Sequence, residues 1–123
     1  MKPVSPAAAY ASMLPVLTEA AREVGYALAP HGSMARDFDV IAVPWTEEAG
    51  SAEELIMRLL AKTGCHLCDG GSMREVDGEK KLVTVRGDTG TPKPHGRRAW
   101  VVLIGNGFYL DVSVMPRQGA LAP

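Results

Sequence analysis

One long segment repeats apolar side chains at the spacing of an amphipathic helix. Between Tyr10 and Val24 these side chains recur every three or four residues, a period that predicts a helix with one buried face. Ser5-Pro6 supplies an N-cap and a proline at the first helical position, and Gly25 ends the pattern. Pro15 removes an internal hydrogen bond, so we expect either a kink there or a regular helix that begins near Ser12.

A second helix is predicted by its capping residues. In Ser51-Ala52-Glu53-Glu54 the serine hydroxyl can accept from the third helical amide while Glu54 reaches back to the cap amide. The buried stripe expected after this box consists of Leu55, Ile56, Leu59 and Leu60. Gly64 supplies the left-handed residue that ends such a helix.

The remaining apolar runs are short and predict strands. These runs are residues 26–29, 38–43, 82–85, 100–104 and 108–114. Gly105-Asn106-Gly107 predicts a hairpin between the last two runs. We expect a loop or short hairpin over 69–81, a polar excursion over 87–98 and a frayed tail over 116–123.

This order of elements predicts an α+β fold. We expect a mixed or antiparallel sheet of about five strands with two helices packed on one face. The chain has 123 residues, of which 46% are hydrophobic, enough for one core. The sequence therefore predicts a single domain over residues 1–123.

Charge and hydropathy exclude several classes of protein. The net charge is -1, which gives no support to general nucleic-acid binding, since such proteins usually carry a basic stripe. It has no run of about 18 apolar residues and no signal-peptide core, so we expect no membrane span and a cytoplasmic location.

Two cysteines form the motif Cys65-His66-Leu67-Cys68. Half of a zinc site and a redox dithiol both use this spacing, but structural zinc needs four ligands. His31 and His95 are the candidates for completing such a site, and neither has a finger-like spacing. We expect two ordinary reduced thiols, because intracellular thiols are normally kept reduced.

Three acids fall within or beside the predicted strands. Asp37 and Asp39 are two residues apart, which on a strand places both carboxylates on one face, roughly 7 Å apart. Asp111 lies in the last apolar run, and if its strand pairs beside them the three carboxylates would favour Mg²⁺ or Mn²⁺. The structural alternative is a turn cap at Asp37, an arginine pair at Asp39 and an exposed sheet face at Asp111.

Nearby residues suit a phosphorylated substrate such as a nucleotide. Gly32 would let a phosphate approach the backbone, and Ser33 would donate its hydroxyl. The basic side chains of Lys93, His95 and Arg97 could bind the phosphates, although charge clusters on connections are common and a solvated loop needs no ligand.

These residues resemble the nucleotidyltransferase superfamily, typified by DNA polymerase beta and the small antitoxin-type enzymes. The matching residues are Gly32-Ser33, Asp37-Phe38-Asp39 and Asp111, and Ala35-Arg36 is similar to a pair found in the small members. The resemblance implies that Asp37 and Asp39 hold two metals, that Asp111 binds one and helps activate the acceptor, and that Arg36 lies at the substrate. The family has a short helix between its Gly-Ser and its acids, for which this chain leaves no room, so side chains would have to bind the nucleotide.

The chain also resembles small phage and prophage proteins without assigned chemistry, which share its Gly-Ser, Ala-Arg-Asp and Ile-Ala-Val-Pro-Trp sequence motifs. That resemblance implies an accessory protein of the host cytoplasm, so a non-catalytic phage accessory or protein-interaction domain is the alternative to an enzyme. A homodimer is a third alternative, with Trp45, Trp100 or Phe108 as the aromatic anchor. Otherwise we expect each of these aromatic side chains in the core.

Overall fold

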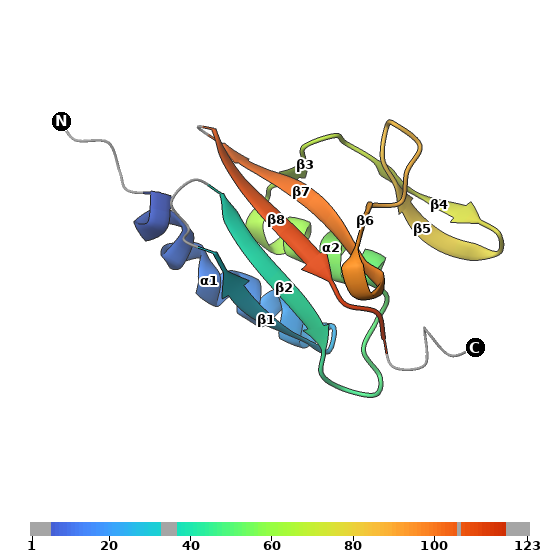
Figure 1. Ribbon diagram of the computed structural model, residues 1–123, viewed down its shortest axis with the longest axis horizontal. Helices are drawn as coiled ribbons and strands as arrows, with labels where there is room; N and C mark the ends of the chain where they lie inside the picture. Colours follow the sequence, from blue (N-terminus) through green and yellow to red (C-terminus); the bar gives the residue numbers. More distant parts are fainter. Residues whose placement is uncertain (1–5, 33–36, 106, 118–123) are drawn as a thin grey trace.

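The computed structural model describes residues 6–32, 37–105 and 107–117 (Figure 1). Ser33 and Arg36 of the predicted substrate site, Asn106 of the predicted hairpin loop and residues 118–123 of the predicted tail lie outside them. Helix α1 (Pro6–Glu23) runs through Pro15, so of the two alternatives the one in which its regular part begins near Ser12 is wrong.

The main sheet has six strands and is mixed, as the α+β prediction requires. Its strands are β1 (Tyr26–His31), β2 (Phe38–Pro44), β8 (Phe108–Val114), β7 (Arg97–Gly105) and β3 (His66–Leu67) in spatial order, with β6 (Thr91–Lys93) paired to the start of β7. Strands β2 and β8 are parallel, whereas every other pair is antiparallel. The strand at the centre of the sheet, β8, is also the last of the described strands in the sequence.

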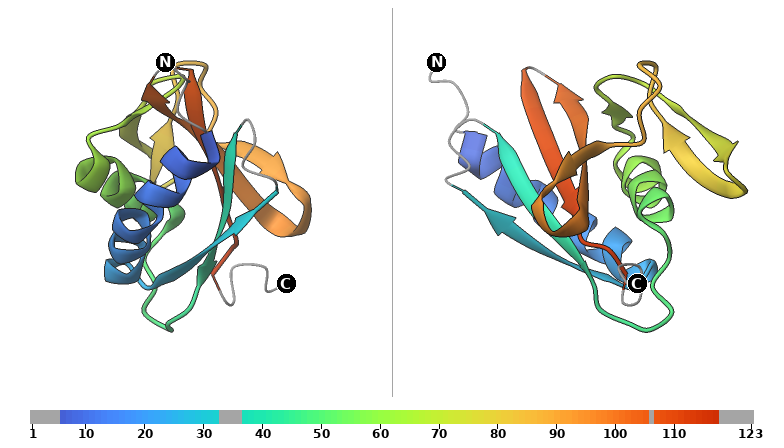
Figure 2. Two further views of the ribbon diagram at one scale, coloured as in Figure 1. Left: turned by 90° about the vertical axis from the view of Figure 1, so that its left-hand side faces the viewer. Right: turned by 45° about the vertical axis from the view of Figure 1, so that its right-hand side comes forward.

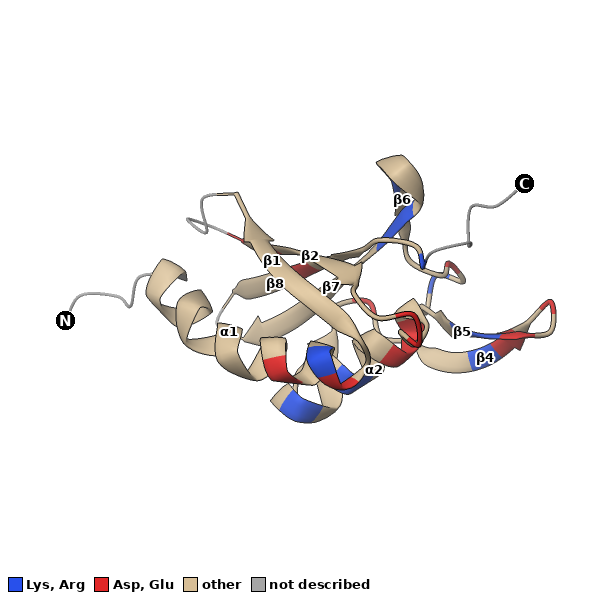
Figure 3. Cartoon of the chain, turned by 90° about the horizontal axis from the view of Figure 1, so that it is seen from below, with Lys and Arg blue, Asp and Glu red and all other residues tan. Residues whose placement is uncertain are grey.

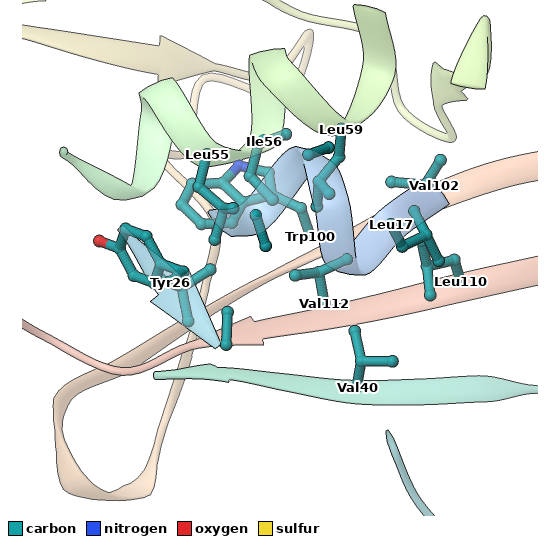
Figure 4. Close-up of a cluster of buried hydrophobic side chains, with 14 of the residues drawn as sticks. Leu17, Tyr26, Val40, Leu55, Ile56, Leu59, Trp100, Val102, Leu110 and Val112 are labelled. Carbon is teal, nitrogen blue, oxygen red and sulfur yellow. The ribbon is translucent and has the colours of Figure 1, made fainter. Parts of the chain in front are cut away.

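Both helices cover the same face of this sheet, as Figure 2 shows. The core lies between them and the sheet, and Figure 4 shows side chains from α1, α2 (Ala52–Thr63) and four strands meeting there. Along β2, Phe38, Val40 and Ala42 are buried in this core. Because strand side chains alternate, Asp39 and Ile41 point to the face that carries no helix.

The ends of α2 match the prediction from the sequence. The Glu54 amide donates to Ser51 Oγ at 3.1 Å, and the Ser51 amide donates to Glu54 Oε1 at 3.2 Å, which completes the capping box. Gly64 is left-handed, with φ of 74°. Local chemistry alone therefore sets the boundaries of this helix.

A separate hairpin, β4 (Ser72–Val76) with β5 (Glu79–Val83), projects from the body (Figure 1). The hairpin alternative for residues 69–81 is thus confirmed, and the strand predicted over 82–85 is confirmed for Leu82 and Val83, the last residues of β5, but not for residues 84–85. The chain turns after Val83 because the Thr84 amide donates to Asp88 O at 2.8 Å and the Gly87 amide to Thr84 O at 2.9 Å.

Two short strands were not predicted from the pattern. The strand β3 lies within the cysteine motif and pairs with β7, and the Cys68 amide donates to Val101 O at 2.8 Å. The strand β6 lies within the predicted polar excursion, and the 3-10 turn η1 (Pro94–Gly96) joins it to β7. Pairing with β7 orders both segments, although neither has an apolar pattern of its own.

Candidate functional site

The parallel pairing of β2 and β8 places two carboxylates side by side. Asp39 and Asp111 are directly paired residues, so their side chains leave the same face of the sheet from strands about 4.8 Å apart. His31 pairs with Asp39 on one side, and Val101 pairs with Asp111 on the other. These four residues form a row across the face of the sheet that carries no helix. Figure 3 shows few other charged residues on the main sheet.

Asp37 lies outside the strand that was predicted to carry it. It occupies an exposed bend, because the pairing of β2 with β8 begins at Phe38 and Leu110. The prediction of two acids on one strand is therefore wrong. Asp37 still lies close enough for its charge to contribute to the raised pKa of Asp111.

The surroundings of Asp111 disfavour the charged form of its carboxyl. Burial raises the pKa of its carboxyl above the ordinary value of 3.8, and the neighbouring Asp39 charge raises it further. Lys93 and His31 act in the opposite direction. Neither Asp39 nor Asp111 accepts a hydrogen bond within the described part of the chain, so two half-buried carboxylates face each other without a donor.

We expect Asp111→Asn to stabilise the metal-free protein at neutral pH by about 0.2–1 kcal/mol, because like charges on directly paired residues destabilise a sheet. Since folding raises this pKa, the penalty is fully present above the raised value and disappears as the pH falls below 3.8. Urea denaturation of both proteins at neutral and acidic pH measures the difference. A variant no more stable than the wild type at neutral pH would contradict this account.

Gly32 borders the acid pair. Its φ is +80°, and a side chain placed there would have its Cβ 3.4 Å from Asp39 Oδ2, an ordinary contact distance. The predicted phosphate-contacting glycine is thus next to a carboxylate of the pair.

Basic side chains lie on the same face of the sheet. Lys93 and Arg97 are directly paired residues of β6 and β7, so they lie on strands and not in a loop, although Lys93 is exposed to solvent as the alternative predicted. Arg97 Nη1 donates to Ser113 Oγ at 3.2 Å, and Ser113 follows Asp111 by two residues on the same face. His95 is exposed in η1, with φ of 68°. The acid pair therefore has cationic neighbours along β8.

The described ranges contain no group of three or more His, Cys, Asp or Glu residues arranged to hold a metal ion. Cys65 and Cys68 are both free thiols. A metal bound here would thus take two protein carboxylates, and its other ligands would come from substrate and water. This arrangement is the usual one for Mg²⁺.

A buried ion pair was missed by the sequence analysis. Arg98 donates to both carboxylate oxygens of Glu53, at 3.2 Å to Oε1 and more closely to Oε2. Glu53 Oε2 also accepts from the Leu82 amide at 3.4 Å, which joins α2 to the projecting hairpin. Glu53 precedes buried Ile56 by three residues, so helical spacing could have identified its position.

The three aromatic candidates have different environments. Trp100 is buried, and Phe108 packs against the core, where its ring meets that of Tyr10 edge to face. Trp45 is 78% exposed, so the expectation of core burial is wrong for this side chain. It lies just after β2, where the chain leaves the sheet.

Comparisons with protein-family models, curated proteins and solved structures found no match. Among the described helices, none is long and apolar enough to cross a membrane.

Proposed function

We propose that this protein catalyses a metal-dependent nucleotidyl or phosphoryl transfer at the Asp39–Asp111 pair. The observation that carries the proposal is the pairing of these two half-buried carboxylates, which have no hydrogen-bond donor in the described residues. A charge held in such a place destabilises the fold unless a partner compensates it. A divalent cation would compensate both charges at once.

The donor set suits Mg²⁺ or Mn²⁺. Hard oxygen ligands favour these ions, and Mg²⁺ commonly takes one or two carboxylates together with substrate phosphates. When bound, the metal would polarise a phosphoryl oxygen and stabilise the charge that develops during displacement. Asp39 and Asp111 would hold it.

The surrounding residues would orient the substrate. Lys93 and Arg97 place two cations on the same face, where they would bind the phosphates that the metal leaves unneutralised. Gly32 has no side chain to block an approach to Asp39. The order of a strand, a Gly-Ser, an Asp-x-Asp and an acid on a later strand supports nucleotidyltransferase chemistry by its resemblance to that superfamily.

Metal binding is the direct test. We expect the wild type to bind Mn²⁺, measured by the loss of the free-ion electron paramagnetic resonance signal, and to melt at a higher temperature with Mn²⁺ and a nucleoside triphosphate together. Asp39→Asn/Asp111→Asn should lose both responses while its metal-free form stays folded.

The matched control is Glu75→Gln/Asp77→Asn, which removes two exposed acids from the projecting hairpin. Asp77 has φ of 52°, a conformation that asparagine also adopts. This control should keep the wild-type responses. A wild type without Mn²⁺ binding at millimolar concentration, or equal binding by the Asp39→Asn/Asp111→Asn protein, would refute the proposal.

A further inference from the structure

The loop over residues 45–50 presents an exposed tryptophan on a fixed backbone. The Trp45 amide donates to Gly25 O at 2.8 Å, and the Gly50 amide donates to Val24 O at 2.9 Å. These bonds fasten both ends of the loop to the turn between α1 and β1. The backbone that carries the Trp45 indole, 78% exposed, is therefore fixed before any partner arrives. Exposed tryptophans that become buried on association dominate the energy of many interfaces.

Two acids follow this tryptophan along the loop. Glu47 and Glu48 are exposed, and neither forms an ion pair within the described part of the chain. Exposed acids without partners keep their full charge available for another molecule. The loop thus fits a hollow that has an apolar wall and a basic rim.

A pocket with these properties opens on the same chain, between the start of α2, β5 and the segment after β8. Its volume is ≈ 670 Å³. Its apolar lining comes from Tyr26, Val114, Met115 and Pro116. Its basic lining comes from Lys80, Lys81, Arg98 and Arg117.

The charges of this pocket are only partly compensated internally. Of its three acids, Glu53 and Glu79 pair with Arg98 and Lys81. The third, Glu54, makes no ion pair within the described ranges and accepts from the Ser51 amide at 3.2 Å in the helix cap. Lys80 and Arg117 are exposed and make no ion pair with any described residue. The lining has four basic and three acidic side chains, so the pocket is net positive and opposite in charge to the loop.

The loop and the pocket lie at one end of the molecule. Tyr26, which lines the pocket, pairs with Pro44, the residue before the loop begins. Ser51, which also lines the pocket, is the first residue after the loop. Figure 1 shows the loop after β2 and the segment after β8 at the same end of the sheet. A surface that carries both a protrusion and its complementary hollow can pair with itself about a two-fold axis.

We propose that a second copy of this chain is the partner: the Trp45 loop of each protomer enters the pocket of the other, and Glu47 and Glu48 face Lys80 and Arg117 across the interface. This dimer is independent of the acid pair and of the chemistry proposed for it.

Sedimentation velocity over a range of protein concentrations tests the dimer. We expect the wild type to associate reversibly, and raising the salt from about 0.05 M to about 0.5 M should weaken association because exposed charges are screened. Trp45→Ala should raise the dissociation constant by about tenfold or more, as loss of a central aromatic anchor does. The fluorescence of Trp45 should shift to the blue as the dimer forms, while buried Trp100 contributes a constant signal.

Charge reversal separates this geometry from nonspecific association. Glu47→Lys/Glu48→Lys and Lys80→Glu/Arg117→Glu should each be monomeric alone, since like charges then face each other at both contacts. An equimolar mixture should dimerise, because both contacts of the mixed pair again join opposite charges.

Glu19→Lys/Arg22→Glu is the control, because it exchanges two exposed charges of α1 outside the loop and pocket. It should dimerise as the wild type does. A wild type that stays monomeric at all concentrations, a dimer unaffected by Trp45→Ala, or a mixture of the two reversed proteins that fails to associate would each overturn the proposal.

Discussion

Replacing Arg98 with methionine is expected to lower the free energy of unfolding by about 3 kcal/mol, the lower end of the range for breaking a buried ion pair. The Glu53 side chain is 2% exposed and would keep the Leu82 amide as a donor, at 3.4 Å, but would have no ion-pair partner among the described residues. The variant also loses two hydrogen bonds from the guanidinium to Thr89 O, at 2.8 and 3.0 Å, and the stacking of Arg98 over Trp100. Urea denaturation followed by far-ultraviolet circular dichroism gives the difference.

The pH dependence identifies Glu53 as the cause. Burial acts to raise the pKa of this carboxyl, but the hydrogen bonds and charge of Arg98 outweigh burial and hold the pKa below its ordinary value of 4.5. The pair therefore stabilises the wild type above pH 4.5, and this contribution is lost as the pH falls through the lowered value. In Arg98→Met the Glu53 carboxyl has no arginine to keep it charged, so it takes up a proton as the pH falls. The difference in free energy of unfolding between the two proteins should therefore be smaller in acid than at neutral pH.

The double variant Glu53→Leu/Arg98→Met is the control. It removes both charges, and an apolar pair of similar volume often replaces a buried ion pair without loss of stability. It should therefore recover most of the stability that Arg98→Met loses. Equal stability of Arg98→Met and the wild type at neutral pH would show that the pair contributes nothing to the fold.

Gly25→Ala should also cost about 3 kcal/mol, for two separate reasons. Its φ is +89°, a left-handed conformation that costs an alanine about 1–2 kcal/mol. The added Cβ would lie 2.5 Å from Thr46 Oγ1 and 2.8 Å from Ala49 Cα, so the loop after β2 must shift, at an overpacking cost of about 1–3 kcal/mol. Thermal or urea denaturation measures the total.

Gly64→Ala separates the two contributions. Gly64 has a similar φ of +74°, but a Cβ there would have no atom within 4 Å. It should lose only the backbone part, about 1–2 kcal/mol. If the two variants lose the same stability, the contact between Gly25 and the loop is not a tight one.

The features that could be predicted from the sequence are those set by residues close to one another along the chain. The capping box at Ser51 and the glycine at Gly64 fix α2, and alternation of apolar side chains gives the buried face of β2. These features need only a helical or extended period and a few side-chain donors and acceptors. The α+β class followed from the order of such elements.

The features that the sequence did not predict depend on contacts between residues far apart in the chain. Nothing within residues 66–67 or 91–93 resembles a strand, and both become strands because β7 offers an unpaired edge. Asp39 and Asp111 were correctly placed near each other by assuming that their strands pair, whereas Asp37 was misplaced because the register of that pairing begins one residue later. Arg98 was assigned to a solvated segment since its partner Glu53 lies on a distant helix.

The position of β8 has a consequence for the order in which the chain can assemble. This strand is the last in the sequence but lies between β2 and β7 in space, so the sheet exists as two unconnected parts until it inserts. Contacts across such long sequence separations form late and slow the folding of a domain. During synthesis, the nascent protein would expose the unpaired edges of β2 and β7 to other chains until β8 leaves the ribosome. The acid pair would be complete only at that final step.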